Sequence, residues 1–239
     1  MARAFARNDH ALIAASIRTQ IAAGAEALDL NFGIDPPAAE LPWVIAVARD
    51  AAPGVPLWID AARPASISVA LEACARDSIA EPFVVNSLAV GGETVATDEA
   101  LLHAAASASA SLVISPQRVG YDGPADGEVE HVLRETSLAA DRALSIEVSP
   151  PFFVDALVYP ALHHPAGVRR SLALIRAYGR REDVVPLAVV GNIAFGAPRE
   201  LASRLRAVYA AAATGVVVAR VDPARRRRRL HAGRPPRAR

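Results

Sequence analysis

The feature of this sequence that most restricts its fold is a repeated alternation between short apolar runs and longer segments with helical periodicity. We expect seven principal strands, at residues 27–33, 56–61, 82–88, 110–115, 152–158, 186–191 and 215–221, with a weaker candidate at 144–148. We expect helices at 10–23, 39–51, 64–75, 97–107, 127–142, 165–178 and 197–213. Nearly continuous apolar strands that alternate with helices are typical of a parallel sheet covered on both sides, so the pattern predicts an α/β fold.

Periodicity alone leaves two parallel architectures open, a doubly wound sheet and a (β/α)8 barrel of the TIM type. Polar residues at strand ends favour the barrel, namely Asp60, Asn86, Asp155 and Asn192. Barrels build their sites from the carboxyl ends of several strands, whereas a doubly wound sheet concentrates its site at one crevice. The glycine-rich phosphate loop expected at such a crevice is absent from the sequence.

Composition indicates one large domain followed by a basic tail. The chain has 239 residues, of which 52% are hydrophobic, and all 26 of its basic residues are arginine. Nine of these arginines lie at or after Arg220, which leaves 17 Arg against 24 Asp and Glu in the rest of the chain. We expect a domain over 1–223 and a disordered tail over 224–239, because blocks of like charge are usually disordered.

The tail could bind RNA, anionic lipid or an acidic partner, but it has no aromatic residue for stacking, so we expect no nucleic-acid or membrane partner. No apolar run approaches the roughly 18 residues of a membrane span, and we expect a cytoplasmic protein. The one cysteine, Cys74, excludes an internal disulfide and a cysteine-based zinc site.

The four polar strand ends suit one kind of ligand if they converge. Taken singly, each is explained equally well as a helix cap or a hydrogen-bonded turn residue. Taken together, two carboxylates and two amides suit a flat heterocycle with a donor-rich edge, because a carboxylate accepts two parallel hydrogen bonds and an amide pairs one acceptor with one donor. The 2-amino-4-oxo edge of a pterin has that pattern, although spacing alone does not name the ligand.

Five stretches of the chain, in this order, resemble the pterin-binding family. Within that family they are most similar to the methyltransferases that act between methyltetrahydrofolate and a corrinoid protein, and to the folate module of cobalamin-dependent methionine synthase. The resemblance runs from about residue 8 to about residue 223. The stretches are "GAEALDLNFG", "LWIDAARPASISVALEAC", "FVVNSLAVGGE", "FFVDALVYPAL" and "PLAVVGNIAFGAPRELASRL".

The resemblance implies a TIM barrel that binds a pterin at the carboxyl ends of its strands. By position, Asp60 corresponds to the carboxylate that holds the pyrimidine edge, Asn86 to the amide beside it, and Asp155 to a second carboxylate. Asn192 corresponds to the asparagine near N5, and Asn31 lies where its strand end would face the ligand. Asn192 and Asp155 are the expected catalytic residues.

The implied reaction moves a methyl group between N5 of methyltetrahydrofolate and the cobalt of a cobalamin-type corrinoid. The corrinoid would be carried by a partner protein, so we expect no metal bound to this chain. The resemblance also implies a homodimer.

The sequence departs from the family at both ends, and two other functions stay open. We expect a barrel without the family's first strand and last helix. A dihydropteroate synthase-like enzyme is one alternative, but the lysine expected after the last but one strand is absent from "GNIAFG". The other alternative is a non-catalytic pterin-binding protein. His163 and His164 form a weak candidate for a metal ligand or a base.

Overall fold

The computed structural model describes residues 9–33, 40–61, 63–76, 83–90, 99–116, 128–213 and 217–219. These ranges contain one seven-stranded sheet: β1 (Leu28–Asn31), β2 (Leu57–Asp60), β3 (Phe83–Val90), β4 (Ser111–Pro116), β5 (Phe152–Asp155), β6 (Val184–Val189) and β7 (Val217–Ala219). The helices are α2 (His10–Ala22), α3 (Glu40–Ala51), α4 (Pro64–Arg76), α5 (Glu99–Ser107), α6 (Glu128–Ser145), α7 (Pro165–Tyr178) and α8 (Arg199–Ala212), with a short 3-10 helix, η2 (Val190–Ala194).

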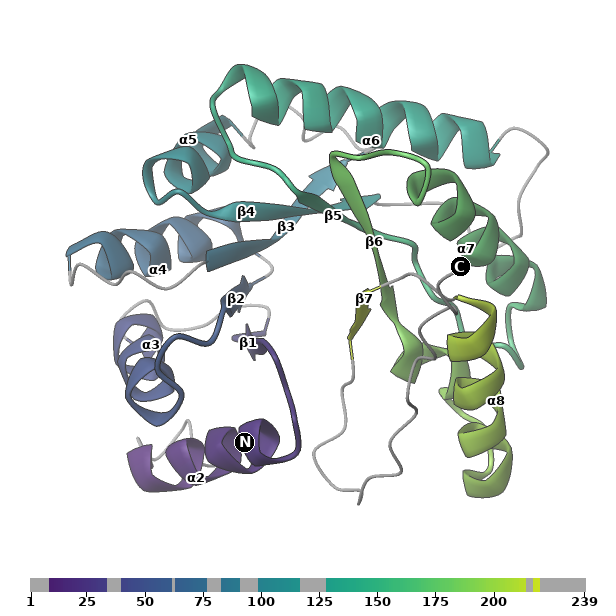
Figure 1. The fold of residues 1–239 in the computed structure, drawn as a ribbon, viewed down its shortest axis with the longest axis horizontal. Helices are drawn as coiled ribbons and strands as arrows, with labels where there is room; N and C mark the ends of the chain where they lie inside the picture. The colour runs from purple at the N-terminus through teal and green to yellow at the C-terminus, as the bar shows by residue number, and fades with distance from the viewer. Residues whose placement is uncertain are drawn as a thin grey trace, which may run out of the picture.

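The order of the strands identifies the architecture. Each strand pairs in parallel with the next one along the chain, so the order in the sheet is β1-β2-β3-β4-β5-β6-β7. A doubly wound sheet reverses its strand order at a switch point, and this sheet does not. Figure 1 shows the sheet curling, with the helices on its outer side and with β1 and β7 at its two ends. The expectation of a partial TIM-type barrel is confirmed at this level.

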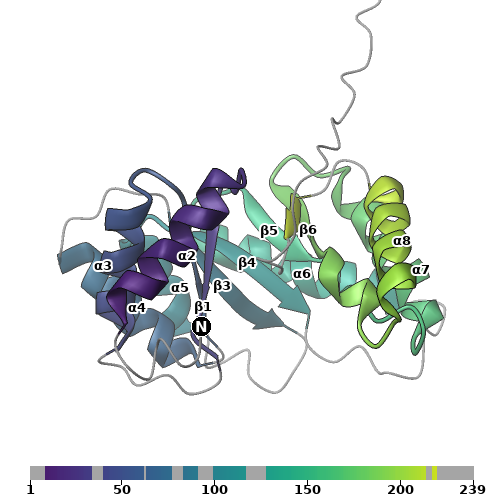
Figure 2. The ribbon, with the colours of Figure 1, turned by 90° about the horizontal axis from the view of Figure 1, so that it is seen from below.

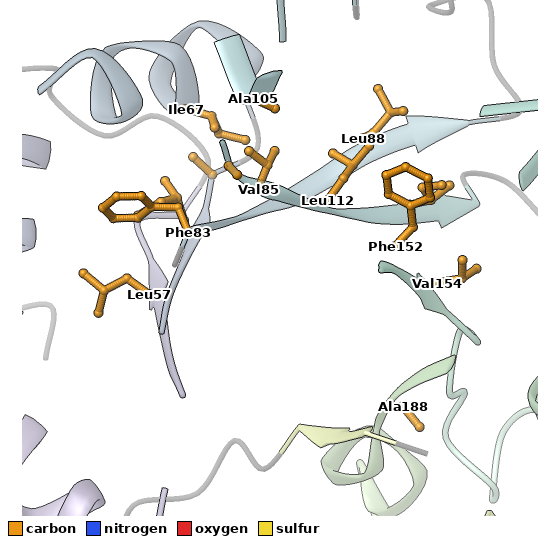
Figure 3. Close-up of a cluster of buried hydrophobic side chains, with 14 of the residues drawn as sticks. Leu57, Ile67, Phe83, Val85, Leu88, Ala105, Leu112, Phe152, Val154 and Ala188 are labelled. Atoms are coloured by element: carbon orange, nitrogen blue, oxygen red, sulfur yellow. The ribbon is translucent and has the colours of Figure 1, made fainter. Parts of the chain in front are cut away.

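The outer face of the sheet carries the main hydrophobic core. Side chains alternate between the two faces of a strand, so Leu57, Phe83 and Val85 lie on the same face as the covering helices and are buried. Figure 3 shows these side chains in one layer with Ile67 of α4. Three buried α4 residues, Ile67, Leu71 and Cys74, follow helical spacing, which explains why this segment forms a helix against β2 and β3.

The inner face carries a second, smaller apolar cluster. Its buried members are Trp58, Val84, Val113 and Leu187, and Phe153 packs against them. The Trp58 and Phe153 rings lie 4.8 Å apart between centroids. The cluster therefore joins β2 and β3 to β4, β5 and β6 from inside the curl, and it marks which residues of each strand point inward.

Most expected elements are confirmed, and the differences have local causes. Helix α7 has the expected bounds, with Pro165 at its first position and Gly179 just after its end. The weaker strand at 144–148 is wrong, because α6 continues to Ser145 and a turn follows. Strand β6 begins two residues earlier than expected and ends at Val189. The tail expected at 224–239 lies outside the described residues.

None of the helices in the described ranges combines the length and the apolar character that a membrane span requires. Figure 2, seen from below, places α2 to α5 toward one end of the molecule and α7 and α8 toward the other. The sheet lies between these two groups of helices, so the molecule has two halves that meet at β3 and β4.

Candidate functional site at the carboxyl ends of the strands

Three of the polar residues predicted from the sequence occupy inward positions on their strands. Asp60 ends β2 and Asp155 ends β5, as expected. Asn86 does not end its strand, because β3 continues to Val90 and pairs with β4 beyond a register shift after Asn86. Asp60, Asn86 and Asp155 each lie two residues beyond a member of the inner apolar cluster, so they point to the same side of the sheet. Their strands, β2, β3 and β5, run parallel in one sheet, so they point toward the same edge of it. The structure therefore brings these side chains to one face and one edge, and their role as ligands stays a prediction.

Asn31, Asp60 and Asn86 are direct neighbours across the sheet. Asn31 of β1 is opposite Asp60 of β2, which is opposite Asn86 of β3. The Asn31 amide nitrogen donates a short hydrogen bond to Asp60 Oδ2, and the Gly33 N–H donates to Asn31 Oδ1 at 2.9 Å. Both ends of the Asn31 amide are thereby occupied, so Asn31 holds the Asp60 carboxylate in a defined orientation.

Asp29 is a fourth member of this group, and it was missed from the sequence. It lies on the inward face of β1 opposite Trp58, and its Oδ1 accepts a hydrogen bond from the Asn86 amide nitrogen at 3.4 Å. The sequence does carry a signal for it, because Asp29 lies two residues before Asn31 in the strand "LDLN" and therefore on the same face. We call Asp29, Asn31, Asp60 and Asn86 the rim quartet.

The electrostatics of the rim quartet raise the pKa of both of its carboxyl groups. Burial, together with the neighbouring charge of Asp29, raises the pKa of Asp60 to about 6, and the hydrogen bond from Asn31 opposes this rise. Burial also raises the pKa of Asp29, although this side chain keeps contact with solvent, and the hydrogen bond from Asn86 opposes that rise. Two carboxyl groups that share a site commonly behave in this way.

Asp155 makes its described hydrogen bond inside its own loop. Its Oδ1 accepts from the Leu157 N–H at 2.8 Å, and Leu157 has a φ of 49°, which a branched side chain rarely adopts. Burial raises the pKa of the Asp155 carboxyl. Burial is the main cause that raises the pKa of the Tyr178 and Tyr209 phenols, and the charge of Asp155 adds to it.

Asn192 is not at a strand end, because β6 ends at Val189 and Asn192 lies in the 3-10 helix that follows. Its side chain is exposed, and its backbone carbonyl accepts from the Phe195 N–H at 3.1 Å. The loop that carries it is tied to the loop after β5 by a hydrogen bond from Ala161 N–H to the Ile193 carbonyl at 3.0 Å. Asn192 therefore lies beyond the same edge of the sheet as the rim quartet.

The two adjacent histidines have separate surroundings. His164 precedes the first residue of α7, and its ring lies edge-on to Tyr159 with centroids 5.9 Å apart. His163 lies close to Gly196, where an added Cβ would be 3.0 Å from Nε2. Within the described ranges, His, Cys, Asp and Glu side chains form no group of three or more that could hold a metal ion.

Fold and site together define an open parallel β/α barrel with carboxylates and amides gathered at the carboxyl ends of its strands. No protein-family model matches the sequence. No curated protein matches it either.

Solved structures do resemble the fold. Mycobacterium tuberculosis Rv1207 superposes with a TM-score of 0.58 at 20% identity, over 86% of this chain and 78% of that one. A dihydropteroate synthetase solved with a product gives a TM-score of 0.59 at 15% identity, over 89% and 79%. The dihydropteroate synthase FolP of Clostridium difficile, solved in the presence of pteroic acid, gives a TM-score of 0.56 at 14% identity. That match covers 89% of this chain and 80% of the other. These proteins share the fold of this chain.

Proposed function

We propose that this chain binds a pterin at the carboxyl ends of β1, β2 and β3, with Asp60 as the principal contact. The observation that carries this proposal is the inward-facing Asp60 carboxylate, held by Asn31 and flanked by Asn86. A pterin presents a ring N–H and an adjacent amino group, which donate two parallel hydrogen bonds to one carboxylate. Charge-assisted pairs of this kind are the stronger hydrogen bonds of proteins.

The similar structures support a pterin as the ligand. Two of them are dihydropteroate synthases, and one of these was solved in the presence of pteroic acid. Each of the two folds covers 89% of this chain. A ligand can therefore be compared at the carboxyl ends of corresponding strands. The sequence resemblance described above implies pterin-binding roles for Asp60 and Asn86, and it supports the proposal independently of these structures.

We propose that the reaction at this site is methyl transfer between N5 of methyltetrahydrofolate and the corrinoid of a separate partner protein. N5 is a tertiary amine and leaves poorly, so the reaction needs a hydrogen bond or a proton that strengthens as the methyl–nitrogen bond breaks. Asn192 is the proposed donor near N5, since an amide donates without titrating. Asp155 is the proposed second carboxylate, and burial raises the pKa of its carboxyl group.

Dihydropteroate synthesis is the second candidate, because two of the similar structures carry that name. That reaction expels diphosphate and needs basic side chains near the leaving group. The chain has no lysine, and the described loop over 190–198 contains no basic residue. The absence of a cation at this position favours methyl transfer.

A calorimetric titration tests the binding proposal. We expect methyltetrahydrofolate to bind the wild-type chain and to bind the Asp60→Asn variant about a hundredfold more weakly, because two charge-assisted hydrogen bonds are lost. Asp50→Asn is the matched control, since Asp50 is exposed and lies on α3. Equal affinity in wild type and Asp60→Asn would exclude the proposed contact.

Two activity assays then separate the reactions. Mixing the methyltetrahydrofolate complex with a reduced corrinoid protein should change the cobalt absorbance, and Asn192→Ala should slow that change. Formation of dihydropteroate from a dihydropterin diphosphate and p-aminobenzoate would instead identify the second candidate. Binding without turnover in either assay would identify a non-catalytic pterin-binding protein.

A further inference from the structure

The orientation of the Asn86 side-chain amide is fixed by Asp29. The Asn86 nitrogen donates to Asp29 Oδ1 across β2. An ionised carboxylate only accepts hydrogen bonds, so the amide end that faces it has to be the NH₂ end. The Asn86 carbonyl oxygen is consequently directed away from Asp29.

Asn31 is oriented by the same rule at the other side of Asp60. Its nitrogen faces Asp60, and its oxygen receives the Gly33 N–H. Both amides of the rim quartet thus turn their donors toward carboxylates of the quartet itself. Each amide uses one of its two N–H groups in this way. The acceptors that remain for a ligand are the Asp60 carboxylate and the Asn86 carbonyl oxygen, which is turned away from Asp29.

We propose that Asp29 is a specificity-determining positioning residue, which acts through Asn86 to make this site select a 2-amino-4-oxo ring over a 2,4-dioxo ring. The proposal rests on the pterin-binding function proposed above. The amino group of a pterin has two hydrogens, one for Asp60 and one for the Asn86 oxygen. A 2,4-dioxo ring places a carbonyl oxygen there, and acceptors then face acceptors.

Asp29 is suited to this indirect role by its place in the strand. It lies one inward position before Asn31, opposite Trp58, whereas Asn86 lies opposite Asp60, the last residue of β2. The Asp29 carboxylate therefore lies below the ligand edge and contacts Asn86 from the side of the apolar cluster. A substitution of Asp29 is expected to change the ligand preference through the Asn86 amide and not through a lost ligand contact.

The first test compares the affinities of pterin and of lumazine, the 2,4-dioxo analogue, by calorimetry. We expect wild type to prefer pterin, and we expect Asp29→Leu to reduce that preference about tenfold, because Asn86 can then rotate and donate to the lumazine oxygen. Asp60 supplies the preference that remains. Asp29→Asn retains an acceptor for Asn86 and should lie between wild type and Asp29→Leu. Asp50→Leu is the exposed control and should keep the wild-type ratio.

The second test needs no ligand. The Asn86 side-chain NH₂ signal in a nitrogen-15 NMR spectrum is assigned by its loss in Asn86→Ala. We expect it to shift as Asp29 titrates, and to lose that response in Asp29→Leu while keeping it in Asp60→Asn. The same spectra report whether each variant is folded.

The outcomes separate the two proposals. An unchanged pterin-to-lumazine ratio in folded Asp29→Leu overturns the positioning role. An Asn86 signal that ignores Asp29 also overturns it. If wild type binds neither ring while the Asn86 signal follows Asp29, the pterin-binding function fails and the orientation of Asn86 by Asp29 stands.

Discussion

The hydrogen bonds between polar side chains lie on opposite faces in the two halves of the sheet, although Asp155 of β5 points inward like Asp60. In the β1–β3 half, the rim quartet lies on the inner face, around the carboxyl ends of β1 and β2. In the β4–β6 half, the buried polar side chains lie among the covering helices. There the Tyr178 hydroxyl meets Thr136 at 3.1 Å, and the Tyr209 hydroxyl meets Ser171 at 2.8 Å.

This contrast between the two halves indicates which polar groups stabilise the fold and which are available to a ligand. The helix-side hydroxyl pairs are buried and satisfied by each other, so they contribute to folding. The rim quartet holds two carboxyl groups close enough for the Asp29 charge to raise the pKa of Asp60, which opposes folding when both are ionised. Groups that are unfavourable in the folded protein alone are typical of functional sites.

The largest expected change in the free energy of unfolding comes from Trp58, whose ring packs between the two halves of the sheet. Trp58 is 8% exposed and packs against Val84 of β3, Val113 of β4 and Phe153 of β5. Trp58→Ala should lower the free energy of unfolding by about 3–5 kcal/mol, since a large buried side chain is lost and a cavity remains. Urea denaturation measures this. Trp43→Ala is the comparison, because Trp43 is half-buried on α3, and an equal loss there would show that the inner cluster has no special role.

The next effect is a pH dependence confined to the rim half. Asp60 has to be ionised to accept two hydrogen bonds, and its pKa is about 6. Pterin affinity should therefore be constant above about pH 7 and fall about tenfold for each pH unit well below 6. Calorimetry across this range checks it. Asp29→Asn removes the neighbouring charge and should move the midpoint to lower pH, whereas an unchanged midpoint would contradict the coupling between the two carboxyl groups.

A smaller effect is expected in the helix-side half. Tyr178→Phe removes the hydroxyl that meets Thr136, and Tyr209→Phe removes the one that meets Ser171. Each change should lower the free energy of unfolding by about 1 kcal/mol, the net value of one buried hydrogen bond. Pterin affinity should stay at the wild-type value in both. A loss of pterin binding without a loss of stability would show that these hydroxyls belong to the ligand site, which would contradict the assignment of this half to folding alone.

The smallest effect is a gain in stability from Asp60→Asn. The folded pKa of about 6 lies above the ordinary 3.8, so the folded chain holds more protons than the unfolded chain between these values. The stability that the Asp60 carboxyl contributes is fully present below pH 3.8, its ordinary pKa, and is lost as the pH rises through about 6. The variant should therefore melt a few degrees higher than wild type at pH 7 and equal it near pH 4. A variant that melts lower at pH 7 would mean that the ionised carboxylate stabilises the fold.

Much of the fold could be predicted from the sequence, because the signals are local. Pro165 and Gly179 mark the two ends of α7, and that helix has the expected bounds. The strand expected at 144–148 is not formed, although Ile146 and Val148 are apolar. Both side chains contact the core from the turn after α6. Apolar character alone does not distinguish such a turn from a strand. The expected start of β6 at Pro186 differs from the observed start at Val184, because a proline is a local signal for the start of a strand and Val184 and Val185 carry no such signal.

The site was predictable in its residue types but not in its contacts. Alternation along a strand indicates that Asp60 and Asn86 share a face, and the parallel order brings their ends together. The hydrogen bond from Asn86 to Asp29 crosses an entire strand, and it depends on the twist of the sheet and on side-chain rotamers. No sequence pattern encodes that distance, so the fourth member of the quartet emerged only from the structure.

The thiol of Cys74 offers one further consequence. It is the chain's one cysteine, it is 1% exposed, and it lies on α4 in the core beside β2 and β3. A reagent that alkylates thiols can reach it only when α4 separates from the sheet. The speed of its modification thus measures how often one end of the molecule opens, without any label having to be introduced, and a bound ligand that bridges those strands should slow it.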